Sequence, residues 1–142
     1  MPATVVALHL CSASRAPLKA VERVNAVLET GLEGDRHAKP GSRRQVLLVE
    51  REVLDGFEIA PGGIREQVTV SGLDLNRLVF GTRLRVGGAL LEVAGPCAPC
   101  ARMDEIQPGL QAELEGRRGR FVRVVGAGTF AVGDAIHVEP PA

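Results

Sequence analysis

Two of the three cysteines in this chain are three positions apart, and each directly follows a proline. Cys97 and Cys100 lie in the segment GPCAPCARMDEI, residues 95–106, where Pro96 and Pro99 restrict the backbone torsion φ. Two thiols at this spacing can form a redox disulfide, supply half of a zinc site, or present one reactive thiolate to a soft ligand. They can also be small buried apolar residues.

The neighbouring residues favour the single thiolate. A thioredoxin-type C-x-x-C starts a helix in a βαβ unit, whereas here a hairpin strand precedes the cysteines and at most a short helical turn fits before Pro108. A structural zinc ion needs four ligands, and only the distant Cys11 and His37 could complete the set. Arg102 lies two positions after Cys100, and nearby positive charge favours a thiolate, which suits soft metals and sulfur transfer.

A glycine-rich loop, GLEGDRHA at residues 31–38, offers a second set of polar groups. Glycines allow the backbone to approach a ligand closely. Arg36 could bind a phosphate through two hydrogen bonds, and His37 could donate a hydrogen bond or act as an acid or base. The alternative is an ordinary surface pair between Asp35 and Arg36 in a solvated turn.

Basic and amide side chains precede the next strands. Arg65 and Gln67 occupy positions i and i+2 in PGGIREQVTVSG, so they share a side once the strand has begun and could contact a planar heterocycle or a phosphate. The alternative is that both are ordinary polar residues on an outer strand face. Arg43 belongs to the basic cluster SRR, residues 42–44, and RRGR at 117–120 is another. Such clusters are either solvated or concentrate charge at a cleft for an anionic cofactor.

Short strands must position these side chains. Strand patterns occupy six regions and short helical patterns occupy two: strands at 4–10, 24–29, 44–50 and 66–72, a hairpin at 82–95 that turns at Gly87-Gly88, two strands within 120–140, and helical turns at 50–57 and 109–116. Frequent short strands with few helical residues predict a mostly β fold, namely a barrel with a few short helices.

Composition limits the classes of function. The chain has 142 residues, which suits a single domain, and 17 basic and 17 acidic residues give zero formal net charge. The balanced charge and the lack of Trp and Tyr exclude a general nucleic-acid binder. No apolar run is long enough to span a membrane, and the start of the chain lacks a signal-peptide pattern. Three cysteines, an odd number, indicate reduced thiols and a cytoplasmic protein.

Taken in order, five segments resemble the MOSC domain family, which also forms the C-terminal module of molybdenum cofactor sulfurases. The resemblance extends from about Val24 to the end of the chain and rests on GLEGDRHA, RQVLLVE, PGGIREQVTVSGLDLNRLVFGTRLRVGGALLEV, PCAPC and GTFAVGDAIHV. It implies one MOSC domain over residues 1–142 and a β-barrel of the pyruvate-kinase-like type. It also implies a cleft that binds the molybdenum cofactor, molybdopterin, through a reactive cysteine.

The resemblance also implies roles for individual residues. In the related mitochondrial amidoxime-reducing component, the second cysteine of a C-x-x-C segment ligates molybdenum, and that position corresponds to Cys100. The Arg-x-Asn pair of the family corresponds to Arg65 and Gln67, which would contact the pterin and its phosphate. Ala98 stands where the reductases often have a serine, so a hydroxyl donor is lost. The remaining residues expected to bind the cofactor are Arg36, His37, Arg43, Cys97 and Arg102.

The function implied by the resemblance is that of a molybdenum cofactor-binding or sulfur-carrier protein that uses Cys100 and does not depend on pyridoxal phosphate. As an enzyme it would be a molybdenum-dependent oxidoreductase that reduces N-hydroxylated compounds, or a sulfur transferase. Because the chain has no flavin or iron–sulfur motif, a redox or sulfur-donor partner protein is expected. The alternatives are a non-catalytic module that delivers a cofactor lost on purification, and a dithiol redox protein that uses Cys97 and Cys100.

Overall fold

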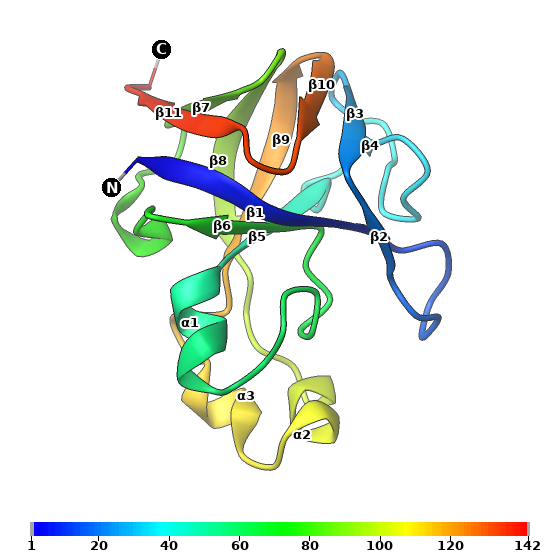
Figure 1. Ribbon diagram of the computed structural model, residues 1–142, viewed down its shortest axis with the longest axis vertical. Helices are drawn as coiled ribbons and strands as arrows, with labels where there is room; N and C mark the ends of the chain where they lie inside the picture. Colours follow the sequence, from blue (N-terminus) through cyan, green and yellow to red (C-terminus); the bar gives the residue numbers. More distant parts are fainter. Residues whose placement is uncertain (1, 142) are drawn as a thin grey trace.

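Seven strands close into a barrel in the computed structural model, which describes residues 2–141 (Figure 1). Their order around the barrel is β11 (Ala135–Glu139), β7 (Arg83–Val86), β8 (Ala89–Pro96), β9 (Arg120–Gly126), β5 (Val46–Glu50), β6 (Val68–Ser71) and β1 (Ala3–Leu10), and β1 pairs with β11 to close the ring. All neighbouring pairs are antiparallel except β5 and β6. The prediction of a mostly β barrel with short helices is confirmed.

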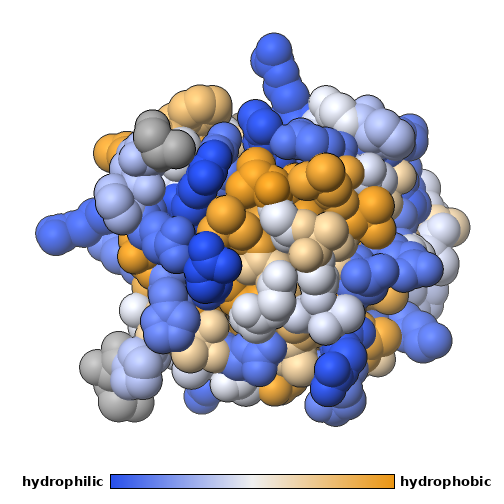
Figure 2. Space-filling view, turned by 90° about the horizontal axis from the view of Figure 1, so that it is seen from above, coloured by the Kyte–Doolittle hydropathy of each residue, from blue (hydrophilic) through white to orange (hydrophobic). Residues whose placement is uncertain are grey.

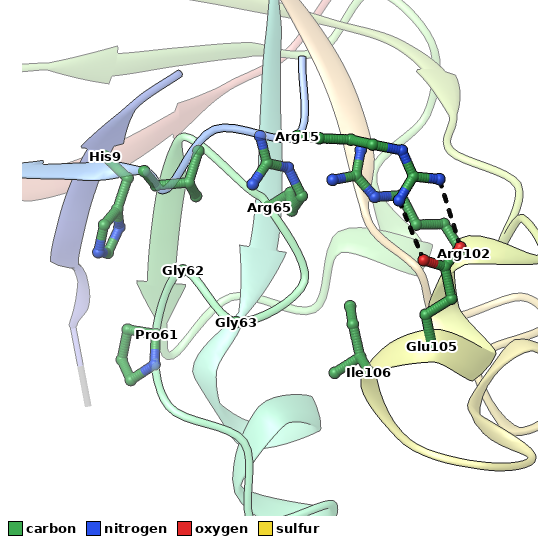
Figure 3. A pocket seen from close by; sticks show the side chains of 10 residues that line it. His9, Arg15, Pro61, Gly62, Gly63, Arg65, Arg102, Glu105 and Ile106 are labelled. Carbon is green, nitrogen blue, oxygen red and sulfur yellow. Dashed lines mark hydrogen bonds and ion pairs between the residues drawn. The ribbon is translucent and has the colours of Figure 1, made fainter. Parts of the chain in front are cut away.

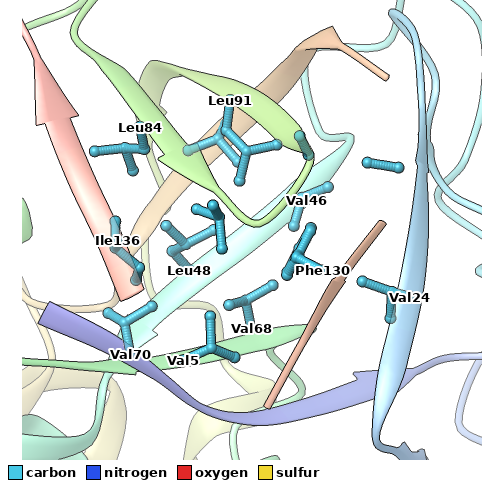
Figure 4. Packing of buried hydrophobic residues seen from close by; sticks show 14 of the residues in the cluster. Val5, Val24, Val46, Leu48, Val68, Val70, Leu84, Leu91, Phe130 and Ile136 are labelled. Atoms are coloured by element: carbon cyan, nitrogen blue, oxygen red, sulfur yellow. The ribbon is translucent and has the colours of Figure 1, made fainter. Parts of the chain in front are cut away.

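A smaller sheet lies against one side of the barrel. It consists of β10 (Gly128–Ala131), β3 (Arg23–Val27) and β4 (Gly31–Leu32), while β2 (Lys19–Val21) extends the large sheet beyond β1. Phe130 of β10 and Val24 of β3 are buried in the same apolar cluster as the barrel strands. Figure 4 shows both side chains pointing toward Val46 and Val68 of the barrel. The small sheet therefore packs against the barrel and shares its apolar core.

Successive side chains along each strand point alternately into the barrel and away from it, and the inward ones form the core. In β7 the side chains of Leu84 and Val86 are buried, whereas Arg83 and Arg85 are partly or fully exposed. Gly87 makes the turn to β8 with a φ of 54°, a backbone conformation that side chains disfavour. A side chain at Gly87 would also meet the carbonyl oxygen of Thr129 at 2.8 Å, because the β7–β8 turn packs against β10.

The helices gather at one end of the barrel, the lower end in Figure 1. They are α1 (Arg51–Gly56), α2 (Arg102–Ile106) and α3 (Leu110–Glu113), and a single 3-10 turn, η1 (Leu75–Arg77), lies elsewhere on the chain. Leu54, Met103, Leu110 and Leu114 pack with the outward side chains of β5 to form a second apolar cluster. This cluster fixes the end of the barrel at which β8 ends and β9 begins.

The last part of the chain differs from its sequence prediction, because residues 120–140 form three strands rather than two. The turn around Ala127 separates β9 from β10, and a second turn at residues 132–134 separates β10 from β11. The sequence analysis assigned only one glycine-rich turn to this region and missed the second, although Gly133-Asp134 marks it. The strands β2 and β4 and the turn η1 are only two or three residues long, too short to give a periodic signal.

An apolar area lies on the surface at the upper end of the barrel. Figure 2 looks onto this end, where the β7–β8 and β9–β10 turns lie, and shows apolar residues in the middle surrounded by hydrophilic ones. Within residues 2–141 no helix is both long enough and apolar enough to cross a membrane.

Candidate functional site

A cavity of about 490 Å³ lies where β8 leaves the barrel, and we call it the thiol cleft. It contains both cysteines of the C-x-x-C segment. Its walls come from the loop before β5, the loop before β6, the end of β8, the start of α2 and the start of β9. The lining residues are Arg36, His37, Arg44, Leu47, Arg65, Gln67, Cys97, Ala98, Pro99, Cys100, Arg102, Met103, Arg118 and Phe121.

The end of β8 presents the two thiols differently. The backbone N–H of Cys97 donates to the carbonyl of Gly119 at 3.0 Å, which ties the segment to the start of β9. The carbonyl of Cys100 accepts from the N–H of Met103 at 2.9 Å, and Met103 is buried among the helices. Cys100 is exposed, whereas Cys97 is half-buried against the helical cluster. The backbone is therefore anchored on both sides of a solvent-accessible Cys100 thiol.

Burial makes the Cys97 thiol less acidic than an ordinary cysteine thiol. Desolvation raises the pKa of the Cys97 thiol above its usual value, and the positive charges of Arg118 and Arg44 oppose this effect without cancelling it. A thiol with a raised pKa is protonated at neutral pH and is a poor metal ligand. All three cysteines are free.

A buried carboxylate organises the glycine-rich loop. Asp35 is 6% exposed, and its carboxylate accepts from Cys11 N at 2.7 Å, from both His37 N and His37 Nδ1 at 3.0 Å, and from Gln67 Nε2 at 3.1 Å. Burial alone raises the pKa of Asp35, but the hydrogen bonds from His37, Cys11 and Gln67 outweigh it and hold the pKa below its usual value. The surface pair of Asp35 with Arg36 is not formed, because Asp35 bonds to His37 instead.

The ring of His37 is oriented by this network. Nδ1 faces Asp35, so Nε2 is the nitrogen left for other groups, and it lies 3.4 Å from Nη1 of Arg36. A histidine held by a carboxylate in this way has a defined tautomer and ring direction. Both His37 and Arg36 line the thiol cleft.

Gln67 has a positioning role in this structure. It is 4% exposed, its Oε1 accepts from the N–H of Leu47 at 2.9 Å, and its Nε2 donates to Asp35. The amide therefore joins β5 to the glycine-rich loop. Sequence reasoning placed Gln67 beside a ligand, and its side chain does line the cleft, but its polar groups are occupied within the protein.

Arg65 adopts a backbone conformation that is uncommon for arginine. Its φ is 69°, and its N–H donates to Gly62 O at 3.0 Å in the turn before β6. Its guanidinium donates to Ala16 O at 2.8 Å and contacts Cys11 Sγ at 3.2 Å. Strained backbone that neighbouring contacts hold in place is typical of ligand sites.

Arg118 is a cleft residue that sequence reasoning did not single out. It is only 7% exposed, and Nη2 donates to Ile64 O at 2.6 Å. Its Nη1 is buried and has no hydrogen-bond partner in residues 2–141. The RRGR cluster contained the signal, but no pattern distinguishes the buried Arg118 from Arg117, which is exposed.

The thiol cleft is strongly cationic. Five arginines line it and no carboxylate does: Arg36, Arg44, Arg65, Arg102 and Arg118. Within the described part of the chain none of the five forms an ion pair with Asp or Glu. Unneutralised guanidinium groups around one cavity attract phosphates and other anions.

Two further cavities adjoin the thiol cleft. The first, the His9 pocket, has a volume of about 480 Å³ and shares Arg65 and Arg102 with the cleft. Figure 3 shows these two arginines together with Arg15 and Glu105. Arg15 and Glu105 form an ion pair with an N–O distance of 3.1 Å. The second, the Phe80 pocket, is lined by Glu29, Gly41, Ser42, Arg43, Arg44, Gln45, Phe80, Ala94, Gly95, Pro96, Cys97, Ala98, Phe121 and Arg123. Arg43, which was expected to bind the cofactor, therefore lies outside the thiol cleft.

The zinc site considered from the sequence is not assembled among residues 2–141. No group of three or more His, Cys, Asp or Glu side chains within this range could hold a metal ion together. Cys11 is buried, and its sulfur contacts Arg65 and Ala13 O. A metal in the thiol cleft would therefore need ligands of its own besides Cys100.

The comparisons with known proteins agree with this architecture. Residues 34–137 match the family model described as the MOSC domain. The chain belongs to the MOSC domain family. The matched region includes every lining residue of the thiol cleft, whereas Cys11 and Ala16, which contact Asp35 and Arg65, precede it.

Solved structures show the same MOSC fold at low sequence identity. The YuaD protein of Bacillus subtilis is 24% identical with a TM-score of 0.83, and the match covers 100% of this chain and 98% of that one. YiiM of Geobacillus stearothermophilus is 18% identical with a TM-score of 0.80, covering 97% of this chain and 75% of that one. YiiM of Escherichia coli is 19% identical with a TM-score of 0.73, and the match covers 98% of this chain and 71% of that one. The comparison with functionally curated proteins gives no match.

Proposed function

We propose that this MOSC domain binds the molybdenum cofactor in the thiol cleft, with Cys100 as the protein ligand of molybdenum. The observation that carries the proposal is the lining of the cleft, which combines an exposed thiol with five arginines and no carboxylate. Thiolates bind soft metals, and arginines bind phosphates. A phosphate-bearing, thiolate-ligated cofactor needs both kinds of group in one cavity.

The buried guanidinium of Arg118 supports the fit. Leaving a buried charged donor without a partner costs free energy, and a positive charge makes the cost larger. Nη1 of Arg118 has no partner in the described chain, although the residue lines the cleft. An anionic cofactor would supply the missing acceptor.

The residues divide into ligands and supports. Cys100 would hold the metal, and Arg36, Arg65, Arg102 and Arg118 would bind the anionic part of the cofactor. Asp35 and Gln67 keep the walls in place, and His37 offers Nε2 to the cavity. Cys97 packs against the helices rather than serving as a second ligand.

When bound, the cofactor supplies two-electron redox chemistry. We propose reduction of an N-hydroxylated compound, in which R–NHOH takes up two electrons and two protons and yields R–NH₂ and water. An external partner protein must supply the electrons. Solvent would supply the two protons, and His37, whose Nδ1 is held by Asp35, would offer Nε2 as a hydrogen-bond acceptor in the cleft. The free thiols agree with a reducing compartment, and we propose the cytoplasm.

A sulfur-carrier role is the second candidate, because the exposed Cys100 thiol also favours it. In that reaction Cys100 would take the terminal sulfur of a donor persulfide, and the donor would leave as a thiol. The reductase reading requires molybdenum and the carrier reading does not.

Elemental analysis tests the proposal. The protein is expressed in a molybdate-fed host, and molybdenum, zinc and pterin fluorescence are measured for the wild type, Cys100→Ser and Cys97→Ser. We expect molybdenum and pterin in the wild type, loss of at least tenfold in Cys100→Ser, and retention of most of the metal in Cys97→Ser. Equal loss in both variants contradicts a single ligand. Persulfide on Cys100 without molybdenum supports the sulfur carrier instead.

A further inference from the structure

The Phe80 pocket is a cavity of about 740 Å³ beside the thiol cleft. We propose that it binds the substrate, and that this substrate is a planar aromatic or heteroaromatic molecule with a negative charge. The inference rests on the proposed function of the thiol cleft and adds a substrate class to it. Three features carry it, namely position, aromatic lining and charge.

The position of the pocket places a bound molecule next to the thiol cleft. The two cavities share Arg44, Cys97, Ala98 and Phe121, so they adjoin each other along these four residues. Cys100 lines only the thiol cleft. A group held by Cys100 would therefore occupy the thiol cleft and leave the neighbouring Phe80 pocket free for a second molecule.

Aromatic side chains are concentrated in this pocket. The chain has four phenylalanines and no Trp or Tyr, and two of the four, Phe80 and Phe121, line the pocket. Phe80 is 71% exposed, so its ring is in water unless something covers it. The guanidinium of Arg44 lies 5.8 Å from the ring centroid of Phe121. Two phenyl rings and a planar guanidinium form surfaces on which a flat ring can stack.

The charge of the pocket selects an anion. Its acidic residue, Glu29, accepts from Arg123 at 2.7 Å and is thereby neutralised. Arg43 and Arg44 have no carboxylate partner in residues 2–141. The pocket therefore keeps two uncompensated positive charges beside its aromatic surfaces.

The test uses the purified protein without requiring cofactor. The four phenylalanines are replaced biosynthetically with 4-fluorophenylalanine, and each ¹⁹F resonance is assigned with a Phe→Leu variant. 1-Naphthoate is titrated as the planar aromatic anion, with cyclohexanecarboxylate and naphthalene-1-methanol as probes that lack the flat ring or the charge. We expect the Phe80 and Phe121 resonances to move while Phe130 in the core does not, and each control probe to bind about tenfold more weakly.

Matched variants locate the binding. Arg44→Ala and Phe80→Ala should each weaken naphthoate binding about tenfold. Arg117→Ala is the control, because Arg117 stacks on Phe57 at 5.2 Å in the same manner but lies outside the pocket, and it should change nothing. Cys100→Ser should also leave binding unchanged. Equal binding of all three probes, equal binding by Phe80→Ala, or loss in Arg36→Ala or Cys100→Ser would each overturn the proposal.

The two proposals fail separately in this design. If naphthoate binds at Phe80 but protein from the molybdate-fed host contains no molybdenum, the proposal for the Phe80 pocket holds and the proposal of cofactor binding fails. If molybdenum binds at Cys100 but naphthoate does not move the ¹⁹F resonance of Phe80, cofactor binding holds and the proposal for the Phe80 pocket fails. A second copy of the chain is the other possible occupant. A dimer in sedimentation that Phe80→Ala dissociates would make this face an interface and overturn substrate binding.

Discussion

The Asp35 carboxylate accepts four hydrogen bonds from three residues that come from different parts of the chain. Cys11 follows β1, His37 lies in the glycine-rich loop, and Gln67 precedes β6. A single buried side chain therefore joins two walls of the thiol cleft, the glycine-rich loop and the loop before β6, to the segment that follows β1. Since hydrogen bonds to an ionised group stabilise it, the network also depends on the charge of Asp35.

Asp35→Asn is expected to destabilise the fold by about 2 kcal/mol at neutral pH, because the amide cannot accept all of these bonds. The pKa of Asp35 is lowered in the folded state, so its contribution is present above the unfolded pKa and is lost as the pH falls through the folded pKa. The difference between the wild type and the variant should thus begin to shrink below about pH 4 and disappear once the pH is below the lowered pKa of Asp35. Urea unfolding at several pH values measures this. The control is Asp55→Asn, whose exposed ion pair with Arg51 should contribute little.

At the scale of elements, the junction of β5 and α1 contains an unfavourable carboxylate. Glu50 ends β5 and precedes α1. Burial, together with the negative charges of Asp74 and Glu52, raises the pKa of Glu50 to about 7. An acid whose pKa is raised on folding binds its proton more tightly in the folded state, so stability is lost as the pH rises from about 4.5 to about 7.

Glu50→Gln should therefore stabilise the protein at about pH 8, by on the order of 1 kcal/mol after allowance for partial solvent exposure, and have little effect near pH 5. Thermal unfolding of both proteins at the two pH values measures the difference. Glu115→Gln, at an exposed position, is the control. A gain of the same size at both pH values would contradict the assignment to ionisation.

At the same scale, the β7–β8 turn is constrained by its close packing against β10. Gly87→Ala should cost more than about 2 kcal/mol, because it adds a clash with β10 to the strain of positive φ. Gly133 has a φ of 93° and open space around it, so Gly133→Ala should show the conformational cost alone, about 1 kcal/mol. Urea unfolding of both variants gives the comparison. Equal losses would mean that the turn and β10 are not in close contact.

At the scale of the whole molecule, the barrel was predictable and the grouping of the site was only partly so. Short apolar runs between turn residues marked most strands, and the paired glycines marked the β7–β8 hairpin. The structure then places Arg36, His37, Arg65, Gln67, Cys97, Cys100 and Arg102 around one cavity. Arg43 differs because it lines only the Phe80 pocket, whereas its neighbour Arg44 lines both that pocket and the thiol cleft.

Burial explains what the sequence could not reveal about the site. Arg118 reads as part of a solvated cluster, and only the fold shows that it is enclosed beside Ile64. The same applies to Gln67, whose partners Leu47 and Asp35 are distant in sequence. Long-range hydrogen bonds leave no periodic trace in a sequence, because they depend on how the elements pack.

The seam of the barrel joins β1 near the start of the chain to β11 near its end, with Ala3 opposite Ile136. During synthesis β1 would emerge early and could pair with β6, yet its edge at Ala3 and Thr4 would wait for nearly the whole chain. Contacts between such distant residues form slowly, and an unpaired strand edge is prone to join another chain. Closure of the ring therefore depends on a strand pair whose members are far apart in the sequence, and this contact is expected to form slowly.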